Sequence, residues 1–304
     1  MALPVLVNSR SPIPVQAQRM QQLESRMDRL QTQISTRARL IDPSDDPAGA
    51  NRSMTLARQD ARLQADQKAI ERTNSRLAFA ESAITSATEA LLRARDLALL
   101  ASNPPISDDD RLSMAREVAV LRTQLLESAN ARDESGRYLF AGSRNGSPPY
   151  MLDADGNASW QGMDTAAGAE AAGLANVTLP RGPDLFGDDL AGTFTQLDAL
   201  QQALLDPDVA TRKPVLDQAI DSIRASHSRL VDARSAIGAN MARLEIETDR
   251  IASTRLTIAE SLAEIRGVDL TAAFAELNSL QLTLTAAQGS FARIYEGSLF
   301  DRLG

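Results

Sequence analysis

Leucine and isoleucine recur at every seventh position between residues 216 and 265, and this repeat constrains the fold more than any other feature of the chain. The ladder consists of Leu216, Ile223, Leu230, Ile237, Leu244, Ile251, Ile258 and Ile265. Because seven residues make about two turns of an α-helix, these side chains form a single stripe along one long helix. A stripe of this length predicts a partner helix of similar length.

A second ladder with the same spacing lies earlier in the chain and is the predicted partner. It consists of Leu56, Leu63, Ile70, Leu77, Ile84 and Leu91. The companion positions are small, as at Ala80, Ala87 and Ala94, whereas a dedicated two-stranded zipper carries apolar residues at both core positions of each heptad. The sequence therefore predicts a mainly α fold: a long antiparallel helical bundle or coiled coil whose helices approach closely.

Each end of the chain carries a narrower apolar stripe with alternating steps of three and four residues. On a helix predicted for residues 15–40 the stripe is Met20, Leu23, Met27, Leu30 and Ile34. On a helix predicted to follow Asp269 it is Leu270, Phe274, Leu277, Leu280, Leu284, Ala287, Phe291 and Ile294. A narrow stripe is poorly buried in a monomer, so we expect the two end helices to pair and to pack against other subunits. The alternative is that both stripes are only the core of a monomeric bundle.

Proline, glycine and short polar residues mark the helix boundaries. The proline-rich residues 1–15 predict an extended tail, and the loop from Pro43, Ser44 and Asp45 to Asp46 and Pro47 predicts a helix start. Further boundaries are predicted at Asn103-Pro104-Pro105, at Ser107 with Asp110 as a capping box, at Pro214, where the second ladder helix begins, and at Gly267.

The composition changes between Gly136 and Gly192, where glycine, proline, asparagine and aspartate gather. Residues 137–141 predict a strand, as do residues 176–179, and Asn145-Gly146 and Asp155-Gly156 predict turns between short strands. We therefore expect a small β subdomain inserted between the helical arms.

The composition offers little material for catalysis or cofactor binding. The chain has 304 residues, a net charge of −8, no cysteine and one histidine, His227. Cysteine-based nucleophiles, disulfides and thiolate metal sites are therefore excluded. Asp108-Asp109-Asp110 is better explained by helix capping than by a metal site, and the calcium-loop pattern that begins at Asp153 lacks its glycine and final glutamate. We expect no enzyme, no cofactor, and neither nucleic acid nor membrane as a partner.

Several motifs together resemble the bacterial flagellin superfamily. The N-terminal signature is Gln33-Ile34-Ser35-Thr36 followed by residues 41–50, IDPSDDPAGA. The motifs at residues 136–143 (GRYLFAGS), 148–150 (PPY) and 160–162 (WQG), with the C-terminal residues 296–303 (EGSLFDRL), are similar to the branch that forms the hook-filament junction. One departure stands out, because the family usually has glycine after the Ser-Thr pair and this chain has Arg37.

The resemblance implies a structural adaptor subunit between the flagellar hook and filament. It implies a terminal coiled-coil domain (1–41 with 268–304), a long helical bundle domain (42–135 with 193–267) and an outer β-rich subdomain (136–192). The implied partners are copies of the chain in a ring, a preceding hook-associated protein, flagellin, and a cytoplasmic export chaperone on the C-terminal helix. The implied location is the extracellular flagellum, reached by type III export without a cleaved signal peptide.

Two rival functions stay open from the sequence: filament flagellin itself and a cytoplasmic coiled-coil scaffold. For the adaptor we expect subunit packing through the two end stripes and through Leu299 and Phe300. Residues 43–47 are expected to form the loop that starts the first long helix.

Overall fold

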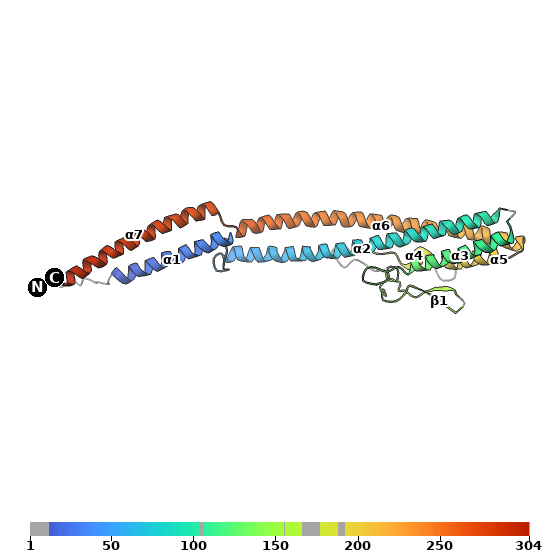
Figure 1. Cartoon of the computed structure of the whole chain (residues 1–304), viewed down its shortest axis with the longest axis horizontal. Coiled ribbons are helices and arrows are strands. Elements are labelled where there is room, and N and C mark those ends of the chain that lie inside the picture. The colour runs from blue at the N-terminus through green and yellow to red at the C-terminus, as the bar shows by residue number, and fades with distance from the viewer. Residues whose placement is uncertain (1–11, 104–105, 155, 166–176, 188–191, 304) are drawn as a thin grey trace. The chain divides into compact units, whose positions relative to one another are not determined.

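The computed structural model describes residues 12–103, 106–154, 156–165, 177–187 and 192–303, which are mainly helical (Figure 1). The chain divides into two compact units. Residues 1–61 with 253–304 make the terminal unit, and residues 62–252 make the central unit. The long helices α2 (Pro47–Ser102) and α6 (Val209–Arg266) each contribute residues to both units.

In the terminal unit the two end helices lie side by side (Figure 1). They are α1 (Pro12–Thr36) and α7 (Leu270–Leu303). The pairing of the two ends expected from the sequence is therefore present in the fold. The prediction of an extended tail up to Val15 was wrong for its last residues, because α1 begins at Pro12; prolines are tolerated in a first helical turn, where a backbone N–H has no partner within the helix.

In the central unit α2 and α6 run antiparallel with their ladders turned inward. The α6 ladder is buried from Leu216 to Ile251, and on α2 the ladder is buried from Ile70 to Leu91. Glu81 and Arg234 form an ion pair of 3.1 Å between the two helices. In the terminal unit Asp60 and Arg255 pair at 2.8 Å, three heptads away on each helix, so one antiparallel register accounts for both pairs.

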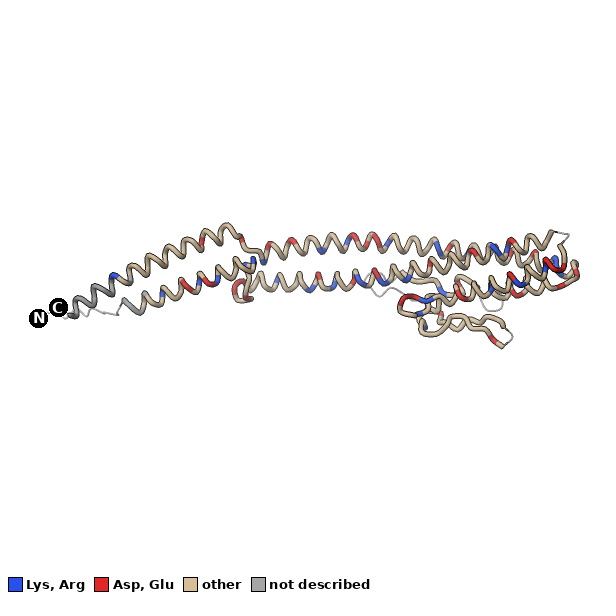
Figure 2. The backbone as a smooth tube through the Cα atoms, in the orientation of Figure 1, with Lys and Arg blue, Asp and Glu red and all other residues tan. Residues whose placement is uncertain are grey.

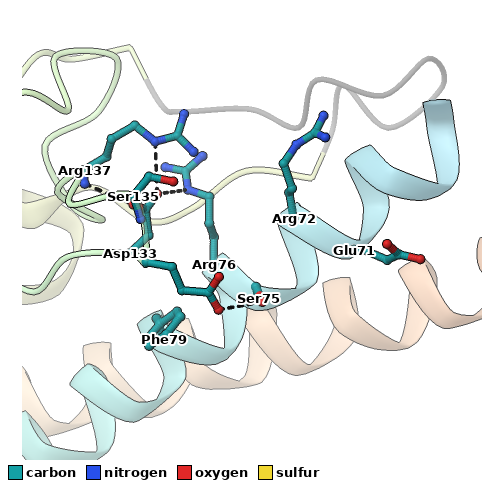
Figure 3. Close-up of a pocket in the computed structure, with 9 residues that line it drawn as sticks. Glu71, Arg72, Ser75, Arg76, Phe79, Asp133, Ser135 and Arg137 are labelled. Carbon is teal, nitrogen blue, oxygen red and sulfur yellow. Dashed lines mark hydrogen bonds and ion pairs between the residues drawn. The ribbon is translucent and has the colours of Figure 1, made fainter.

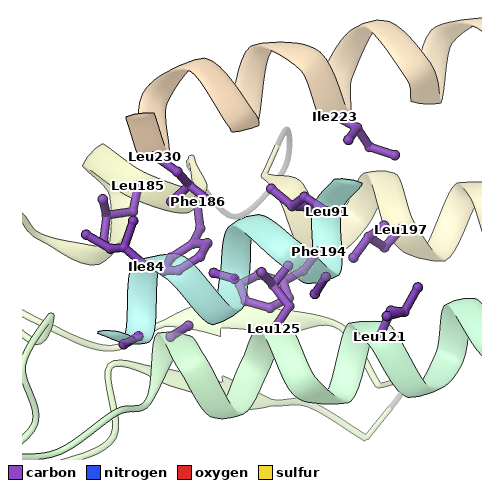
Figure 4. Packing of buried hydrophobic residues seen from close by; sticks show 14 of the residues in the cluster. Ile84, Leu91, Leu121, Leu125, Leu185, Phe186, Phe194, Leu197, Ile223 and Leu230 are labelled. Atoms are coloured by element: carbon purple, nitrogen blue, oxygen red, sulfur yellow. The ribbon is translucent and has the colours of Figure 1, made fainter. Parts of the chain in front are cut away.

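Two shorter helices complete the core of the central unit. They are α3 (Asp108–Ala129) and α5 (Thr193–Leu205), which pack against each other. Figure 4 shows Leu121 and Leu125 of α3 and Phe194 and Leu197 of α5 meeting the ladder of α2. The Ser107 hydroxyl accepts the Asp110 N–H at 3.1 Å, which confirms the predicted cap of α3.

The second ladder helix begins earlier than predicted. We expected its start at Pro214, but α6 begins at Val209 and contains that proline near its first turns. Asp208 supplies the start signal instead, because its carboxylate accepts the Ala210 N–H at 2.9 Å.

The β part of the central unit is smaller than predicted. It is one antiparallel hairpin, β1 (Tyr150–Leu152) with β2 (Ala158–Trp160), in which Tyr150 lies opposite Trp160. The strand predicted for residues 176–179 was wrong for 177–179, which form none, while Asn176 lies outside the described residues. Asn145-Gly146 forms a turn, but no strand precedes it.

The strand predicted for residues 137–141 is also absent. Leu139, Phe140 and Ala141 are all buried, so the alternation of a half-buried strand is missing. The backbone of the segment bonds to scattered partners instead of one neighbouring strand, since the Leu139 N–H donates to the Ala131 carbonyl at 3.0 Å and the Phe140 carbonyl accepts the Gly182 N–H at 2.9 Å. The apolar run is an irregular core segment.

An aromatic cluster anchors this irregular region to the helices. Phe186 belongs to the short helix α4 (Gly182–Phe186), which the sequence did not predict. Its ring lies 6.4 Å from that of Phe140 and 5.8 Å from that of Phe194 on α5. Tyr150 of the hairpin joins at 5.9 Å from Phe186.

Candidate assembly interface

The N-terminal stripe of α1 is only partly covered in the chain. Leu30 is buried, with 8% of its surface exposed, whereas the other four members are half-buried: Met20, Leu23, Met27 and Ile34. Arg26 of α1 and Glu276 of α7 form an ion pair of 2.5 Å that fixes the pairing of the two helices. The α1 stripe thus retains accessible apolar surface.

The C-terminal stripe of α7 divides into two groups. Leu277, Leu280 and Leu284 are half-buried, and Leu270 and Phe274 are exposed. The side chains of four further members expected from the sequence lie outside the described residues: Phe291, Ile294, Leu299 and Phe300. The stripe that meets α1 and the apolar residues that face away are therefore different residues of one helix.

The helix α1 ends in a left-handed residue that is not glycine. Arg37 has φ = +56°, and among the described residues no other non-glycine has positive φ. The Ala38 N–H donates to the Gln33 carbonyl at 3.1 Å and the Arg37 N–H to the Ile34 carbonyl at 3.3 Å. These two bonds make the Schellman C-cap that usually requires glycine, at the position where the sequence departs from the family pattern.

The loop after α1 is organised by Asp45. Its carboxylate accepts the N–H groups of Ile41 and Asp42 at 3.2 and 3.1 Å, which closes a tight turn before α2. Arg29 of α1 forms an ion pair with the same carboxylate. The predicted helix-start loop therefore also joins α1, while Pro43, Ser44 and Pro47 are exposed around it.

Asp46 caps α2, as the sequence predicted. Its carboxylate accepts the Gly49 N–H at 2.8 Å, and this bond, with help from Arg39, holds the pKa of Asp46 below its ordinary value of 3.8. Pro47 then occupies the first helical position, where its missing N–H has no cost.

Sequence patterns missed Arg39, which ties the loop to the end of α6. Its guanidinium donates to the Ile265 carbonyl at 2.9 Å, and its backbone N–H donates to the Arg266 carbonyl at 2.7 Å. Gln33 donates to the Arg39 carbonyl at 2.8 Å. These partners lie more than two hundred residues away or carry no side-chain signal, so only the fold could reveal them.

A hollow of about 250 Å³ lies on the central unit between α2 and the loop after α3 (Figure 3). At its centre the buried Asp133 pairs with Arg76 at 3.2 Å and with Arg137 at 3.1 Å. The N–H groups of Ser135 and Arg137 also donate to this carboxylate. Buried charges are held in this way when they fix a loop, so we regard the hollow as structural.

The remaining candidates from the sequence do not form a chemical site. Within the part of the chain that the structure describes, no group of His, Cys, Asp and Glu side chains could hold a metal ion, and no helix has the length and apolarity to cross a bilayer. His227 is half-buried on α6. Asp153 closes a turn by accepting the Asn157 N–H at 2.8 Å.

Two family profiles match the two arms of the chain. The bacterial flagellin N-terminal helical region matches residues 7–145, and the bacterial flagellin C-terminal helical region matches residues 215–298. The chain belongs to the bacterial flagellin family. Its N-terminal match contains α1, the capped loop and α3, and its C-terminal match contains nearly all of the α6 ladder and most of α7.

Individual relatives within the flagellin family differ in how much of their length this member matches. Flagellar hook-associated protein 3 of Escherichia coli is 28% identical over 88% of this chain and 90% of its own length. B-type flagellin of Pseudomonas aeruginosa is 33% identical, but over 36% of this chain and 22% of its own length. The crystal structure of the flagellar junction protein FlgL from Legionella pneumophila shares the fold, with a TM-score of 0.58 at 16% identity over 64% of this chain and 99% of that chain.

Proposed function

We propose that this flagellin-family chain is a structural adaptor subunit at the junction between the flagellar hook and filament. The observation that carries the proposal is the extent of its likeness to hook-associated protein 3, which runs through nearly the whole of both chains. The half-covered stripes of α1 and α7 support it, because such surfaces suit a subunit that completes its packing by assembly.

Two rival functions fit these observations less well. Filament flagellin is disfavoured because the likeness to B-type flagellin covers 22% of that protein. A cytoplasmic coiled-coil scaffold would need the same two helices, but it gives no reason for likeness to flagellar proteins at both ends of the chain.

The adaptor role carries further proposals on partners, location and domains. The subunit would form a ring with copies of itself, contact the preceding hook-associated protein and flagellin, and be held before export by a chaperone on α7. It would leave the cell through the flagellar type III apparatus without a cleaved signal peptide and reside in the extracellular flagellum. Residues 1–41 with 268–304 would form its inner-tube domain, 42–135 with 193–267 its bundle, and 136–192 its outer subdomain.

We also propose that the chain has no catalytic activity. The relatives are structural flagellar proteins, and the composition gives a catalytic site almost no material, with one histidine and no cysteine.

A deletion strain tests the junction role. We expect cells lacking this chain to make finished hooks, to carry no filaments and to release unpolymerised flagellin into the medium. Expression of the full-length chain from a plasmid is the control and should restore filaments. Short filaments on the deletion strain would contradict the junction role and favour a filament subunit, and detection of the chain only inside flagellated cells would favour the scaffold.

A further inference from the structure

The outward face of α7 is an exposed surface that nothing in the terminal unit covers among the residues that the structure describes. Leu282 is 75% exposed, the highest value for a large apolar side chain in that part of the chain, and Phe274 is 50% exposed. Ala275, Ala286 and Gly289 are exposed at helical spacing around Leu282. An apolar side chain at the centre of a smooth strip of small residues is a shape that another helix can approach closely.

The same face is almost free of charge. From Leu270 to Ala292 the sequence contains one charged residue, Glu276, and Arg26 of α1 already pairs with it. Figure 2 shows the contrast between α7 and the charged residues along α1. A helix face that stays in water normally carries charged side chains, so this face has the character of one that becomes buried.

The stripe that closes the α1–α7 pair is a separate surface. Ala273 is 5% exposed, and Leu280 and Leu284 are half-buried on the side of α7 toward α1. Leu282 lies between these two leucines in sequence, but a step of two residues turns it away from them on a helix. Pairing with α1 therefore leaves the Leu282 face available.

A possible receiving surface lies on α1 of the same unit. A hollow of about 510 Å³ follows one face of that helix and is lined by Gln18, Gln21, Gln22, Ser25, Arg26 and Arg29. Its lining includes no carboxylate, and Arg26 is engaged by Glu276. Neutral amide side chains can flank a leucine while they keep their own hydrogen bonds at the rim.

We propose that the Leu282 face of α7 packs into this α1 groove on the next copy of the chain. The proposal rests on the junction role, because identical subunits around a ring each need two different surfaces in contact. Such a heterologous contact runs from copy to copy and closes when the rotation closes. The absence of charge on the α7 face favours this neutral groove over a nucleic acid, a lipid headgroup or a strongly charged partner.

Engineered disulfides test the contact directly, because the chain contains no cysteine. Two single variants, Gln22→Cys and Leu282→Cys, are produced together in a strain that lacks the wild-type chain, and its isolated flagella are oxidised mildly. A disulfide between the two variants necessarily joins two copies. We expect this mixed dimer on non-reducing gels, and a ladder of higher oligomers when one chain carries both substitutions.

Leu284→Cys is the matched control for Leu282→Cys, two residues away on the covered side of α7. Equal cross-linking of Gln22→Cys with either variant would overturn the proposal. So would a dimer that forms from Leu282→Cys alone, which indicates a symmetric contact, or cross-linking of Leu282→Cys only to a different flagellar protein.

The variant Leu282→Asp separates this inference from the junction role. We expect loss of attached filaments, while the purified monomer keeps the helix content and protease pattern of the wild type. Normal filaments on Leu282→Asp cells would overturn the contact even if the deletion strain lacks filaments. Filaments on the deletion strain itself would instead remove the junction role on which the contact depends.

Discussion

Replacement of Arg37 by glycine should stabilise the end of α1, although the change removes a whole side chain. Arg37 has φ = +56°, and the left-handed region costs an L-residue about 1–2 kcal/mol. Glycine avoids this cost but loses about 0.5–1 kcal/mol more backbone freedom on folding. The net expectation for Arg37→Gly is about 0.5–1 kcal/mol, which lowers the local opening constant roughly two- to fivefold.

Amide hydrogen exchange at Ala38 measures this opening. The Ala38 N–H donates to the Gln33 carbonyl at 3.1 Å, a bond that the left-handed turn at position 37 creates. We expect Arg37→Gly to slow exchange of this amide, and Arg37→Asn to slow it less, because asparagine tolerates the left-handed region better than most residues.

Arg37→Ala is the control, since alanine keeps the Cβ and therefore the backbone strain. If Arg37→Ala slows exchange as much as Arg37→Gly, the arginine side chain and not the backbone is responsible, and the reasoning fails. Exchange at Ala38 that is unchanged or faster in Arg37→Gly would refute it as well.

Three further changes probe the core, the hairpin and the helix start. Ile84→Ala should lower the free energy of unfolding by about 2–5 kcal/mol in urea titrations, because Ile84 is fully buried in the ladder; a loss below about 1 kcal/mol would contradict this packing. Asn130→Ala removes both bonds to the Tyr150 backbone, at 2.9 and 3.0 Å, so hairpin amides should exchange faster while ladder amides keep their protection. The lowered pKa of Asp46 means that its bond to Gly49 stabilises the loop above the ordinary pKa and is lost as the pH falls through the folded value. Acid proteolysis of the loop should therefore rise below about pH 4 in the wild type, and Asp46→Asn should flatten that dependence.

The helical architecture could be predicted from the sequence because its signals are local and periodic. The heptad ladders predicted two long helices, and the structure buries both along most of their length. Ser107 and Asp46 announced helix starts through their own side chains, which bond to N–H groups two or three residues away. Signals of this kind need no knowledge of the rest of the fold.

The β region could not be predicted as well because its apolar residues are held by distant partners. Residues 137–141 have the composition of a strand, but their hydrogen bonds go to the end of α3, the following loop and the start of α4. Phe140 is buried by contacts such as the one with Phe186, which lies far along the chain. A single sequence gives no sign of which of these contacts forms.

The sequence by itself determined that this chain forms paired long helices with apolar stripes at both ends, because side-chain period follows directly from helix geometry. Only the tertiary structure decided which residues of each stripe are used within the chain. Leu284 turns toward α1, whereas Leu282 is left exposed. That division depends on how α1 lies along α7, which the ion pair of Arg26 with Glu276 fixes across most of the chain's length.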